Sequence, residues 1–405
     1  MPNLGFYIAR RYLISRKSLS IISVMSLICM LVVAVVTMAM VVVLSAFNGI
    51  EKLIDERYRY LESDLSITAV YDKVIGLDSL NMDMLRAAEG VDEVAFAVEE
   101  FVLAEYERNQ RIVKMKGVED TFIKRSGIDS LMFDGVAEFH MNNTPSALIG
   151  IGVKYDLNLR MFEQAYNPLR LSALQRGKQL RTNREGAFNR RNIPVAGIFS
   201  INIDFDSDYV IVPLGFATDL LGYDKEVSQV EVQLKKGESL EGRRDELQEM
   251  LGPNYLVKSR LEKNELVYKT NKTEKWATFV IMGFILLIAT FNIIAALTLL
   301  INEKRNDIKV LSGMGAPASL IKRIFFIEGA LINAFGAAIG LGLGLLLVYL
   351  QQHYGLIRLE GGLVDFYPVA YSASDMLAIF SLVVVCGLLS SVVPVQIFTR
   401  RYGAL

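Results

Sequence analysis

The sequence predicts a membrane protein of mixed fold class, with four transmembrane α-helices and a large extracytoplasmic α+β domain between the first and second. Three observations lead to this prediction. Of the 405 residues, 52% are hydrophobic and 21% are charged, a balance too apolar for one soluble domain and too charged for a wholly embedded chain. Four long windows contain no charged residue. The segment between the first two windows instead alternates apolar with polar residues.

The four charge-free windows place the spans. They are bounded by Lys17 and Glu51, Lys275 and Glu303, Glu328 and Arg358, and Asp375 and Arg400. Each window holds the roughly 20 apolar residues that a helix needs to cross the hydrocarbon layer, and windows this long are not expected of a buried core helix. We therefore expect transmembrane helices at residues 21–46, 277–301, 325–350 and 376–396.

The short segments that flank the spans predict the orientation, because Lys and Arg accumulate on the cytoplasmic side. Basic residues outnumber acids in three of these segments, residues 1–20, 302–324 and 397–405. The loop 351–375 instead carries Arg358 against three acids. We therefore expect a multi-pass inner-membrane protein whose termini are cytoplasmic and whose domain 47–276 is periplasmic. The first apolar run is too long for a cleavable signal.

Residues 47–276 are predicted to fold as an α+β domain. Their periodicity predicts strands at Leu65–Tyr71, Val94–Glu105, Arg111–Val118, Asn192–Phe199, Asp208–Val212, Gln229–Leu234 and Tyr255–Ser259, and helices at Met82–Glu89 and Leu240–Leu251. Strand–helix–strand elements stand at both ends of the segment. We therefore expect one porter-like unit built from 47–118 and 225–276, with 119–224 as an inserted subdomain.

Composition and motifs argue against an enzyme and against a nucleic-acid partner. The formal net charge of −1 gives no basic field that would attract phosphates. The sequence has no GxxxxGK[ST], GxSxG, HExxH or CxxC pattern, so we expect no catalytic site, no metal and no cofactor bound by this chain. His140 and His353 lack a metal-ligand pattern, and Cys29 and Cys386 are expected to pack in apolar runs. Glu328, at the start of span three, is expected to snorkel or to pair locally.

The loop between spans two and three predicts a short amphipathic helix. Ile308, Leu311 and Gly315 follow one another at i, i+3 and i+7, which places them on one helix face. Gly313 and Gly315 would end the helix before Pro317. Such a helix suits insertion into a groove on a partner protein, and a plain interfacial turn is the alternative.

A basic stretch interrupts the inserted subdomain at residues 170–191. It has seven basic residues against one acid, Glu185, and Gly177 and Gly186 interrupt it, so we expect a protruding loop. Two interpretations stay open, a solvated surface loop and a docking arm for an acidic protein or for lipid headgroups. The residues expected to dock are Arg176, Lys178, Arg181, Arg184, Arg190 and Arg191.

Several motifs resemble those of the lipoprotein-releasing permeases, the LolC/LolE family, within the wider superfamily of FtsX- and MacB-type permeases. Residues 6–16 resemble the family's opening FxAxRYLxxR, and residues 43–51 resemble its VLSxxNGxE signature. The loop 303–316 is similar to the EKxxxIxxLxxxGA element of the superfamily, although Ser312-Gly313 stands where the family usually has a basic residue and then a small one. Two further landmarks lie in the insertion, at 147–150 and 195–200.

The resemblance implies a transporter in which two permease subunits, as a homodimer or a heterodimer, sit on two LolD-like ATPase subunits that use ATP and Mg. Such transporters take lipoproteins from the inner membrane and pass them to a LolA-like periplasmic carrier. The basic segment 172–191 would lie where some members have a hook that holds the carrier. The coupling helix that docks on the ATPase would comprise Glu303, Lys304, Arg305, Asp307, Ile308, Leu311, Gly313, Met314 and Gly315.

A lipid anchor that leaves the bilayer needs an apolar shelter, because each exposed CH₂ costs about 0.8 kcal/mol. The candidates for lipoprotein and acyl-chain binding form a stripe at the outer end of span one and an aromatic pair at the start of span two: Met40, Val43, Leu44, Phe47, Trp276 and Phe279. The alternative is a stripe that faces membrane lipid or packs against another helix.

Two other functions compete with lipoprotein release. A MacB-type exporter would keep the transporter class but carry a drug, toxin or peptide, and a fused ATPase domain, which these 405 residues lack, would favour it. An FtsX-type protein that signals to a cell-wall hydrolase belongs to a different class. Such proteins usually have a smaller outer domain than the one expected here.

Overall fold

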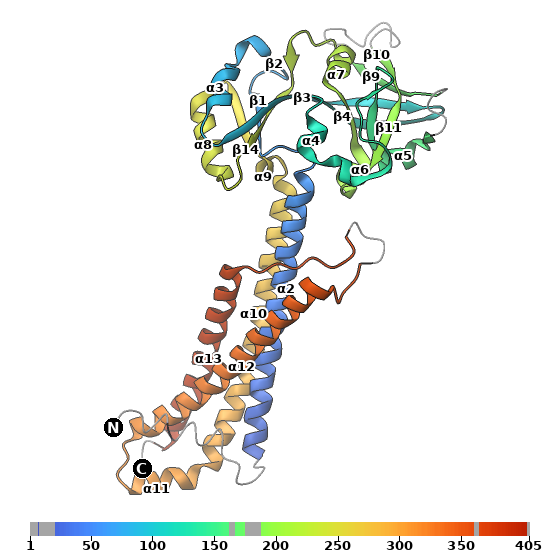
Figure 1. The fold of residues 1–405 in the computed structure, drawn as a ribbon. Helices are drawn as coiled ribbons and strands as arrows, with labels where there is room; N and C mark the ends of the chain where they lie inside the picture. The colour runs from blue at the N-terminus through green and yellow to red at the C-terminus, as the bar shows by residue number, and fades with distance from the viewer. Residues whose placement is uncertain (1–6, 8–20, 162–166, 175–187, 360–363, 403–405) are drawn as a thin grey trace, which may run out of the picture. The chain divides into compact units, whose positions relative to one another are not determined.

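The computed structural model describes residues 7, 21–161, 167–174, 188–359 and 364–402, and Figure 1 follows the chain through them. The chain forms two compact units. One comprises residues 1–53 and 267–405, and the other comprises residues 54–266. The first is a helix bundle and the second is a mixed α+β domain, which confirms the predicted fold class.

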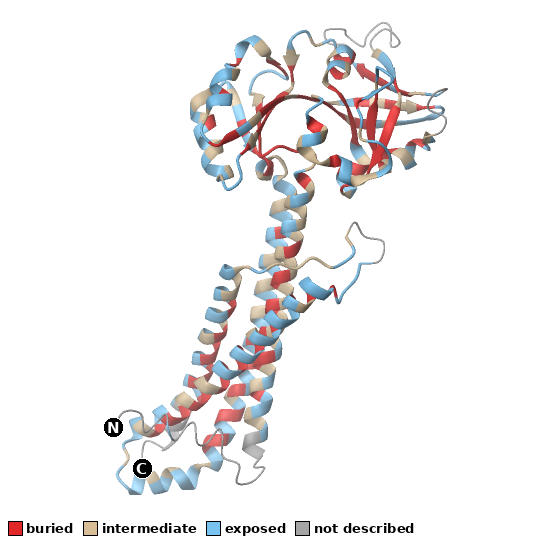
Figure 2. Ribbon diagram, in the orientation of Figure 1, coloured by how far each residue is buried: buried red, intermediate tan, exposed pale blue. Residues whose placement is uncertain are grey.

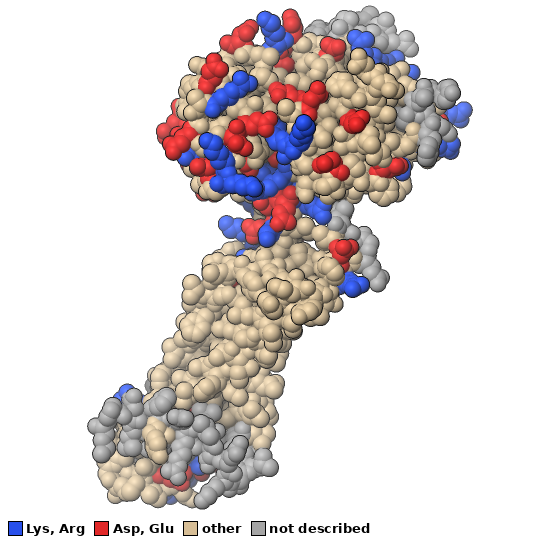
Figure 3. Space-filling model, viewed as in Figure 1, with Lys and Arg blue, Asp and Glu red and all other residues tan. Residues whose placement is uncertain are grey.

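Among the described residues, four helices are long and apolar enough to cross a membrane: α2 (Ile21–Tyr58), α10 (Glu265–Glu303), α12 (Ala318–Tyr354) and α13 (Ala373–Tyr402). Each contains one of the predicted spans. The helices α2 and α10 also continue into the charged sequence next to the α+β domain. The charge-free windows therefore predicted the extent of the apolar layer and not the ends of the helices. The visible face of the bundle is nearly free of charged side chains between its ends (Figure 3).

Glycines on α12 let α2 approach closely. Gly336, Gly340 and Gly344 recur every four residues, so they lie on one face of the helix. A Cβ atom at these positions would lie 2.8, 2.4 and 2.7 Å from the nearest atoms of Met30, Ala34 and Val41. Small residues at such a spacing are typical of tightly packed membrane helices.

The α+β domain is built on a sheet of eleven strands among the described residues. Along the main path the order is β15-β1-β14-β3-β4-β12-β8-β11-β5, and β9 pairs with both β3 and β10. The strands of this sheet are β1 (Leu65–Ala69), β3 (Val91–Tyr106), β4 (Asn109–Val118), β5 (Met132–Gly135), β8 (Ala147–Gly150), β9 (Leu169–Leu174), β10 (Phe188–Ile193), β11 (Val195–Phe199), β12 (Tyr209–Pro213), β14 (Gln229–Leu234) and β15 (Tyr255–Ser259).

Two short ribbons and several helices complete the domain. The ribbons pair β2 (Ile75–Gly76) with β13 (Glu226–Val227) and β6 (His140–Met141) with β7 (Thr144–Pro145). The α-helices are α3 (Met82–Ala87), α4 (Phe122–Ser126), α5 (Ile151–Leu157), α6 (Ile203–Asp208), α7 (Leu214–Leu221), α8 (Leu240–Leu251) and α9 (Arg260–Lys263). Two 3₁₀ turns lie at Leu77–Ser79 and Ile128–Leu131.

The predicted elements at the two ends of the domain are confirmed. The helix and strand expected at Leu240–Leu251 and Tyr255–Ser259 coincide with α8 and β15. The strand expected at Asn192–Phe199 is divided at Pro194 into β10 and β11, because proline has no N–H to donate to a ladder. The sheet continues from β3 and β4 into the strands of the 119–224 segment, so the division into a porter-like unit and an insertion stays a prediction.

The two faces of the sheet differ sharply in polarity. On β3 the side chains of Val98, Val102 and Ala104 belong to an apolar core that α3, α5, α7 and α8 also line. Figure 2 shows buried residues along the strands of the sheet. The intervening Glu99 points to the opposite face, as does Lys116 of the adjacent strand β4, its directly opposed partner. Period-two alternation therefore predicts the core, but one face is lined with buried charge.

The charged face of the sheet contacts the two chain segments that connect the domain to the spans. One segment follows α2, and the other precedes α10. Lys116 is fully buried, lies 2.6 Å from Glu231 and donates to the carbonyl oxygen of Leu61, just after α2. Arg260 of α9, also buried, reaches Asp64 at 3.1 Å and Asp55 at 2.8 Å. Ion pairs thus fix the entry segment and the exit segment to the same sheet.

Glu99 lies at the centre of this charge cluster. Lys114 lies 2.8 Å away, Lys263 lies 3.2 Å away and Lys116 lies 3.7 Å away. Burial disfavours the charged form of Glu99, but the ammonium groups of Lys263, Lys116 and Lys114 outweigh it and hold its pKa well below the usual range. Burial raises the pKa of the neighbouring Glu62, with Lys263 and Lys116 opposing that effect.

Lys116→Met should lower the free energy of unfolding of the isolated domain, residues 54–266, by about 3–5 kcal/mol, because the substitution leaves buried carboxylates uncompensated. Urea denaturation measures this. The matched control is Lys258→Met, an exposed lysine on β15, which should change the unfolding free energy by less than about 0.5 kcal/mol. Equal effects of the two substitutions would contradict the role assigned to Lys116.

The depressed pKa of Glu99 also predicts a pH dependence. The unfolded state binds the proton more readily, so Glu99 contributes stability that is fully present above its ordinary pKa of 4.5 and is lost as the pH falls toward the folded-state value. Glu99→Gln should reduce the loss of unfolding free energy that occurs as the pH falls below 4.5, as measured by urea denaturation at a series of pH values. If the loss is as large in the variant as in the parent chain, other carboxylates cause it.

Candidate functional site

The segment VLSAFNGIE, residues 43–51, lies at the end of the helix bundle from which α2 and α10 lead toward the α+β domain. We call this end the domain-side end of the bundle. Here a triad of side chains connects three helices. Asn48 donates to Asp375 at 2.7 Å and accepts from Lys275 at 2.7 Å, and Lys275 lies 2.8 Å from Asp375. This triad joins α2, α10 and α13. A Cβ on Gly49 would lie 2.3 Å from the backbone of Pro368, so glycine allows the loop between α12 and α13 to cross α2.

Beside this junction lies an apolar pocket of about 460 Å³. Its walls come from α2, from the end of α12 and from the loop that follows α12: Val42, Val43, Ala46, Phe47, Ile50, Leu347, Val348, Gln351, Leu356, Ile357, Tyr367 and Val369. The Gln351 amide donates to the carbonyl oxygens of Ile357 and Tyr367 at 3.1 and 3.0 Å. That polar side chain therefore holds the loop in place, and the space itself is lined by hydrocarbon.

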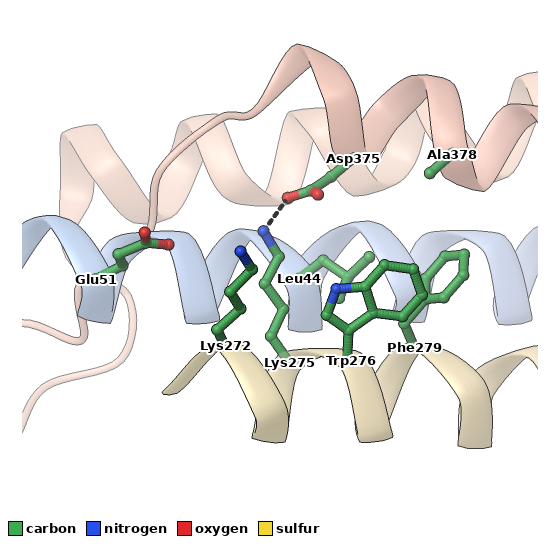
Figure 4. A pocket seen from close by; sticks show the side chains of 8 residues that line it. All are labelled: Leu44, Glu51, Lys272, Lys275, Trp276, Phe279, Asp375 and Ala378. Carbon is green, nitrogen blue, oxygen red and sulfur yellow. Dashed lines mark ion pairs between the residues drawn. The ribbon is translucent and has the colours of Figure 1, made fainter. Parts of the chain in front are cut away.

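A second pocket of about 250 Å³ lies among α2, α10 and α13 (Figure 4). Its apolar part is formed by Leu44, Trp276, Phe279 and Ala378, and the rings of Trp276 and Phe279 meet edge to face with centroids 5.9 Å apart. Its charged part is formed by Glu51, Lys272, Lys275 and Asp375. The pocket therefore changes from charged to apolar along the helices.

The structure divides the six residues predicted to shelter acyl chains. Val43 and Phe47 line the apolar pocket, whereas Leu44, Trp276 and Phe279 line the mixed one. Met40 is fully buried among the spans and lines neither pocket. Sequence reasoning missed the loop residues Leu356, Ile357, Tyr367 and Val369, although four apolar residues in a loop between spans were a usable signal.

The short helix expected between spans two and three is present as α11 (Arg305–Gly313), and Gly315 follows it with a φ of +87°. Its orientation differs from the expectation. Ile308 packs on Leu300, Ile301, Ile321 and Phe325 of the chain's own spans. The exposed apolar side chains near this helix are Val310 and Met314, at 62% and 71% exposure. Leu311 is half-buried, and Glu303, Arg305, Asp307 and Gly313 are exposed.

The basic stretch 170–191 begins and ends in strands and not in a loop. Arg170 lies on β9, and the exposed Arg190 and Arg191 lie on β10, which pairs with β9 in antiparallel register. The expectation of a loop is therefore wrong for these three residues, because ladder pairing overrides their polarity. The other four basic residues, Arg176, Lys178, Arg181 and Arg184, lie outside the described residues.

Glu328 does not snorkel as expected. Its side chain on α12 is 2% exposed, and its Oε2 atom has no hydrogen-bond partner among the described residues. The adjacent Gly329 packs against Leu297 of α10 and Ser391 of α13, which close over this level of the helix. Cys29 and Cys386 are buried free thiols. No cluster of potential metal ligands occurs within the described part of the chain.

Comparison with known proteins agrees with this architecture. Residues 26–250 match the family described as MacB-like periplasmic core domain, and residues 279–402 match the family described as FtsX-like permease C-terminal. The chain is therefore an ABC transporter permease of the FtsX-like class, an inner-membrane protein with a periplasmic domain. Within that class it belongs to the LolC/LolE family of lipoprotein-releasing permeases.

Two curated relatives illustrate the similarity. The transmembrane protein LolE of Haemophilus influenzae is 22% identical over 97% of this chain and 96% of its own length. LolC of Buchnera aphidicola subsp. Schizaphis graminum is 24% identical over 51% of each chain, so the match spans about half the length of that relative. Among solved structures, the extracellular domain of the transporter YknZ from Gram-positive bacteria matches 48% of this chain and 99% of its own, at 12% identity and a TM-score of 0.34.

If Val310 and Met314 dock in an apolar groove of an ATPase subunit, Val310→Asp and Met314→Asp should each abolish most ATPase association, because the new carboxylate would be desolvated without a partner. Co-purification of the ATPase in mild detergent measures this. Ile308→Asp should instead lower the thermal stability of the bundle, because it buries a charge against Leu300 and Phe325. If the ATPase still co-purifies with both exposed-site variants, α11 is not the docking element.

Proposed function

We propose that this chain is the permease subunit that takes lipoproteins out of the inner membrane and passes them to a periplasmic carrier, with ATP hydrolysis supplied by a separate ATPase subunit. The observation that carries the proposal is the apolar pocket at the domain-side end of the bundle, in a chain of the LolC/LolE family. The termini and α11 would then lie in the cytoplasm, as the basic flanks of the spans indicate.

The chemistry of the pocket suits a lipid anchor. Exposing one 14-carbon acyl chain to water costs roughly 11 kcal/mol at about 0.8 kcal/mol per CH₂, so extraction needs both ATP-driven work and an apolar receptor. The pocket supplies hydrocarbon walls from two spans and one loop, and its polar side chain Gln351 is already hydrogen-bonded to that loop. Pocket volumes of this order are usual for binding sites of small ligands.

Two partner surfaces complete the proposal. The exposed Val310 and Met314, with the basic residues around them, would enter a groove of the ATPase. Arg190 and Arg191, on the exposed part of β10, would steer an acidic carrier. A second permease subunit, of the same or a different kind, would complete the transporter.

Phe47→Asp and Val43→Asp should leave assembly intact but retain lipoproteins in the inner membrane, because a carboxylate in the pocket excludes an acyl tail. Fractionation of the membranes measures retention. A photo-crosslinker at residue 43 or 47 should capture a lipoprotein, most strongly without ATP, whereas one at Val35, an exposed α2 residue outside both pockets, should not.

The identity of the captured molecule tests the alternatives directly. A soluble, non-lipidated cargo at residues 43 and 47 would overturn lipoprotein release in favour of a MacB-type exporter. Capture of nothing but a neighbouring permease would show that the pocket is a packing surface.

Arg190→Glu combined with Arg191→Glu should slow carrier association about tenfold at low ionic strength, and added salt should reduce this difference. Stopped-flow association of the carrier measures the rate. Lys236→Glu combined with Lys258→Glu, at two exposed lysines outside β10, is the charge-matched control. An equal effect of that control would show that net charge, and not this strand, sets the rate.

A further inference from the structure

The mixed pocket of Figure 4 carries two charges that the triad does not use. Lys275 and Asp375 neutralise each other and share Asn48. Lys272 and Glu51 also line the pocket, are both exposed, and have no ion-pair or hydrogen-bond partner within the described part of the chain. The pocket thus presents one unpaired cation and one unpaired anion, which come from different helices, α10 and α2.

These charges lie at one end of a polarity gradient. Lys272 precedes Phe279 by seven residues on α10, and Leu44 precedes Glu51 by seven residues on α2, so each helix changes from charged to apolar over about 10 Å. On α13 the same change runs from Asp375 to Ala378. The apolar end points along the spans, and Trp276 stands between the two ends. Tryptophan at such a position marks the interface between headgroups and hydrocarbon.

A glycerophospholipid shows the same change from charged to apolar, from its headgroup to its tails. Its phosphate would meet Lys272, and its tails would begin beside Leu44, Trp276 and Phe279. A ligand with phosphate alone would leave Glu51 facing an anion, whereas a primary ammonium on the headgroup can donate hydrogen bonds to that carboxylate. A quaternary ammonium has no N–H to donate, so phosphocholine fits less well. Charge complementarity therefore disfavours an anionic headgroup, and hydrogen bonding to Glu51 favours phosphoethanolamine over phosphocholine.

We propose that the pocket lined by Glu51, Lys272, Trp276 and Phe279 is a binding site for a zwitterionic phosphatidylethanolamine-type lipid. The site is distinct from the apolar pocket beside Val43 and Phe47, and the residues of the two do not overlap. Its occupancy would hold a bilayer lipid against the junction of α2, α10 and α13. The proposal concerns this chain and a lipid only, so neither the cargo nor a partner protein enters it.

The chain supplies its own reporter, because Trp276 is the single tryptophan among the 405 residues. The full chain is reconstituted in phosphatidylcholine vesicles that contain increasing fractions of lipids with brominated tails, which quench tryptophan at short range. Brominated phosphatidylethanolamine should quench Trp276 at about fivefold lower mole fraction than brominated phosphatidylglycerol or phosphatidylcholine. One net hydrogen bond from the ethanolamine ammonium to the Glu51 carboxylate contributes about that factor.

Lys272→Met and Glu51→Gln should each remove this preference, and Lys272→Arg should keep it. Lys269→Met, an exposed lysine on α10 that does not line the pocket, is the matched control and should behave as the parent chain. Both test residues are exposed, so loss of folding is not expected, and circular dichroism checks it.

Three results would overturn the proposal. Quenching that depends on mole fraction but not on headgroup would show ordinary bilayer contact. A preference for phosphatidylglycerol that Glu51→Gln leaves unchanged would show a plain anion site. Relief of quenching by soluble glycerophosphoethanolamine at millimolar concentration would show that the pocket recognises the headgroup without the lipid. Because the experiment contains no cargo, carrier or ATPase, these results leave the proposed transport function untouched.

Discussion

Two buried cations, Lys116 and Arg260, hold the ends of the α+β domain together. Lys116 joins the sheet to the carbonyl oxygen of Leu61 and to Glu231, and Arg260 joins the last strand region to Asp55 and Asp64. Buried ion pairs are not in general more stabilising than apolar packing, but breaking one partner is costly. Their effect here is geometric. The two segments that lead into α2 and α10 are fixed to one sheet face, so neither can shift without disrupting the charges on it.

The helix bundle depends on a different constraint, close backbone approach. The glycines of α12 allow α2 to pack against it, and Gly49 allows the loop after α12 to cross α2. That crossing places Pro368 and its neighbours against the first span and brings Ile357, Tyr367 and Val369 to the apolar pocket. A motif that appears in the sequence as a signature of span one therefore has a structural explanation. Asn48 joins three helices, and Gly49 makes room for the loop that closes the pocket.

The two pockets also differ in the polarity of the side chains that are available to a ligand. In the apolar pocket the polar side chain of Gln351 donates its hydrogen bonds to the loop. The remaining surface suits a hydrocarbon ligand. In the mixed pocket the triad pairs two of the charges, and Lys272 and Glu51 have no ion-pair partner among the residues that the structure describes. In the proposed transport function the cargo must be kept apart from the surrounding lipid, and two sites of different polarity are one physical means of doing so.

The sequence by itself determined the spans, the class of the domain, most of its strands and the short helix between spans two and three. These features depend on local periodicity and on the absence of charge, which a chain displays without folding. It also located Val43, Phe47, Leu44, Trp276 and Phe279 near the domain-side end. The tertiary structure alone decided that these residues divide between two pockets, that Met40 is buried, and that Ile308 faces inward while Val310 and Met314 face outward. It alone placed Arg170 and Arg190 on paired strands and Glu328 away from water. The physical reason is that each of these outcomes depends on which other helix, strand or loop covers a residue, and contacts between distant segments leave no periodic signal in the chain.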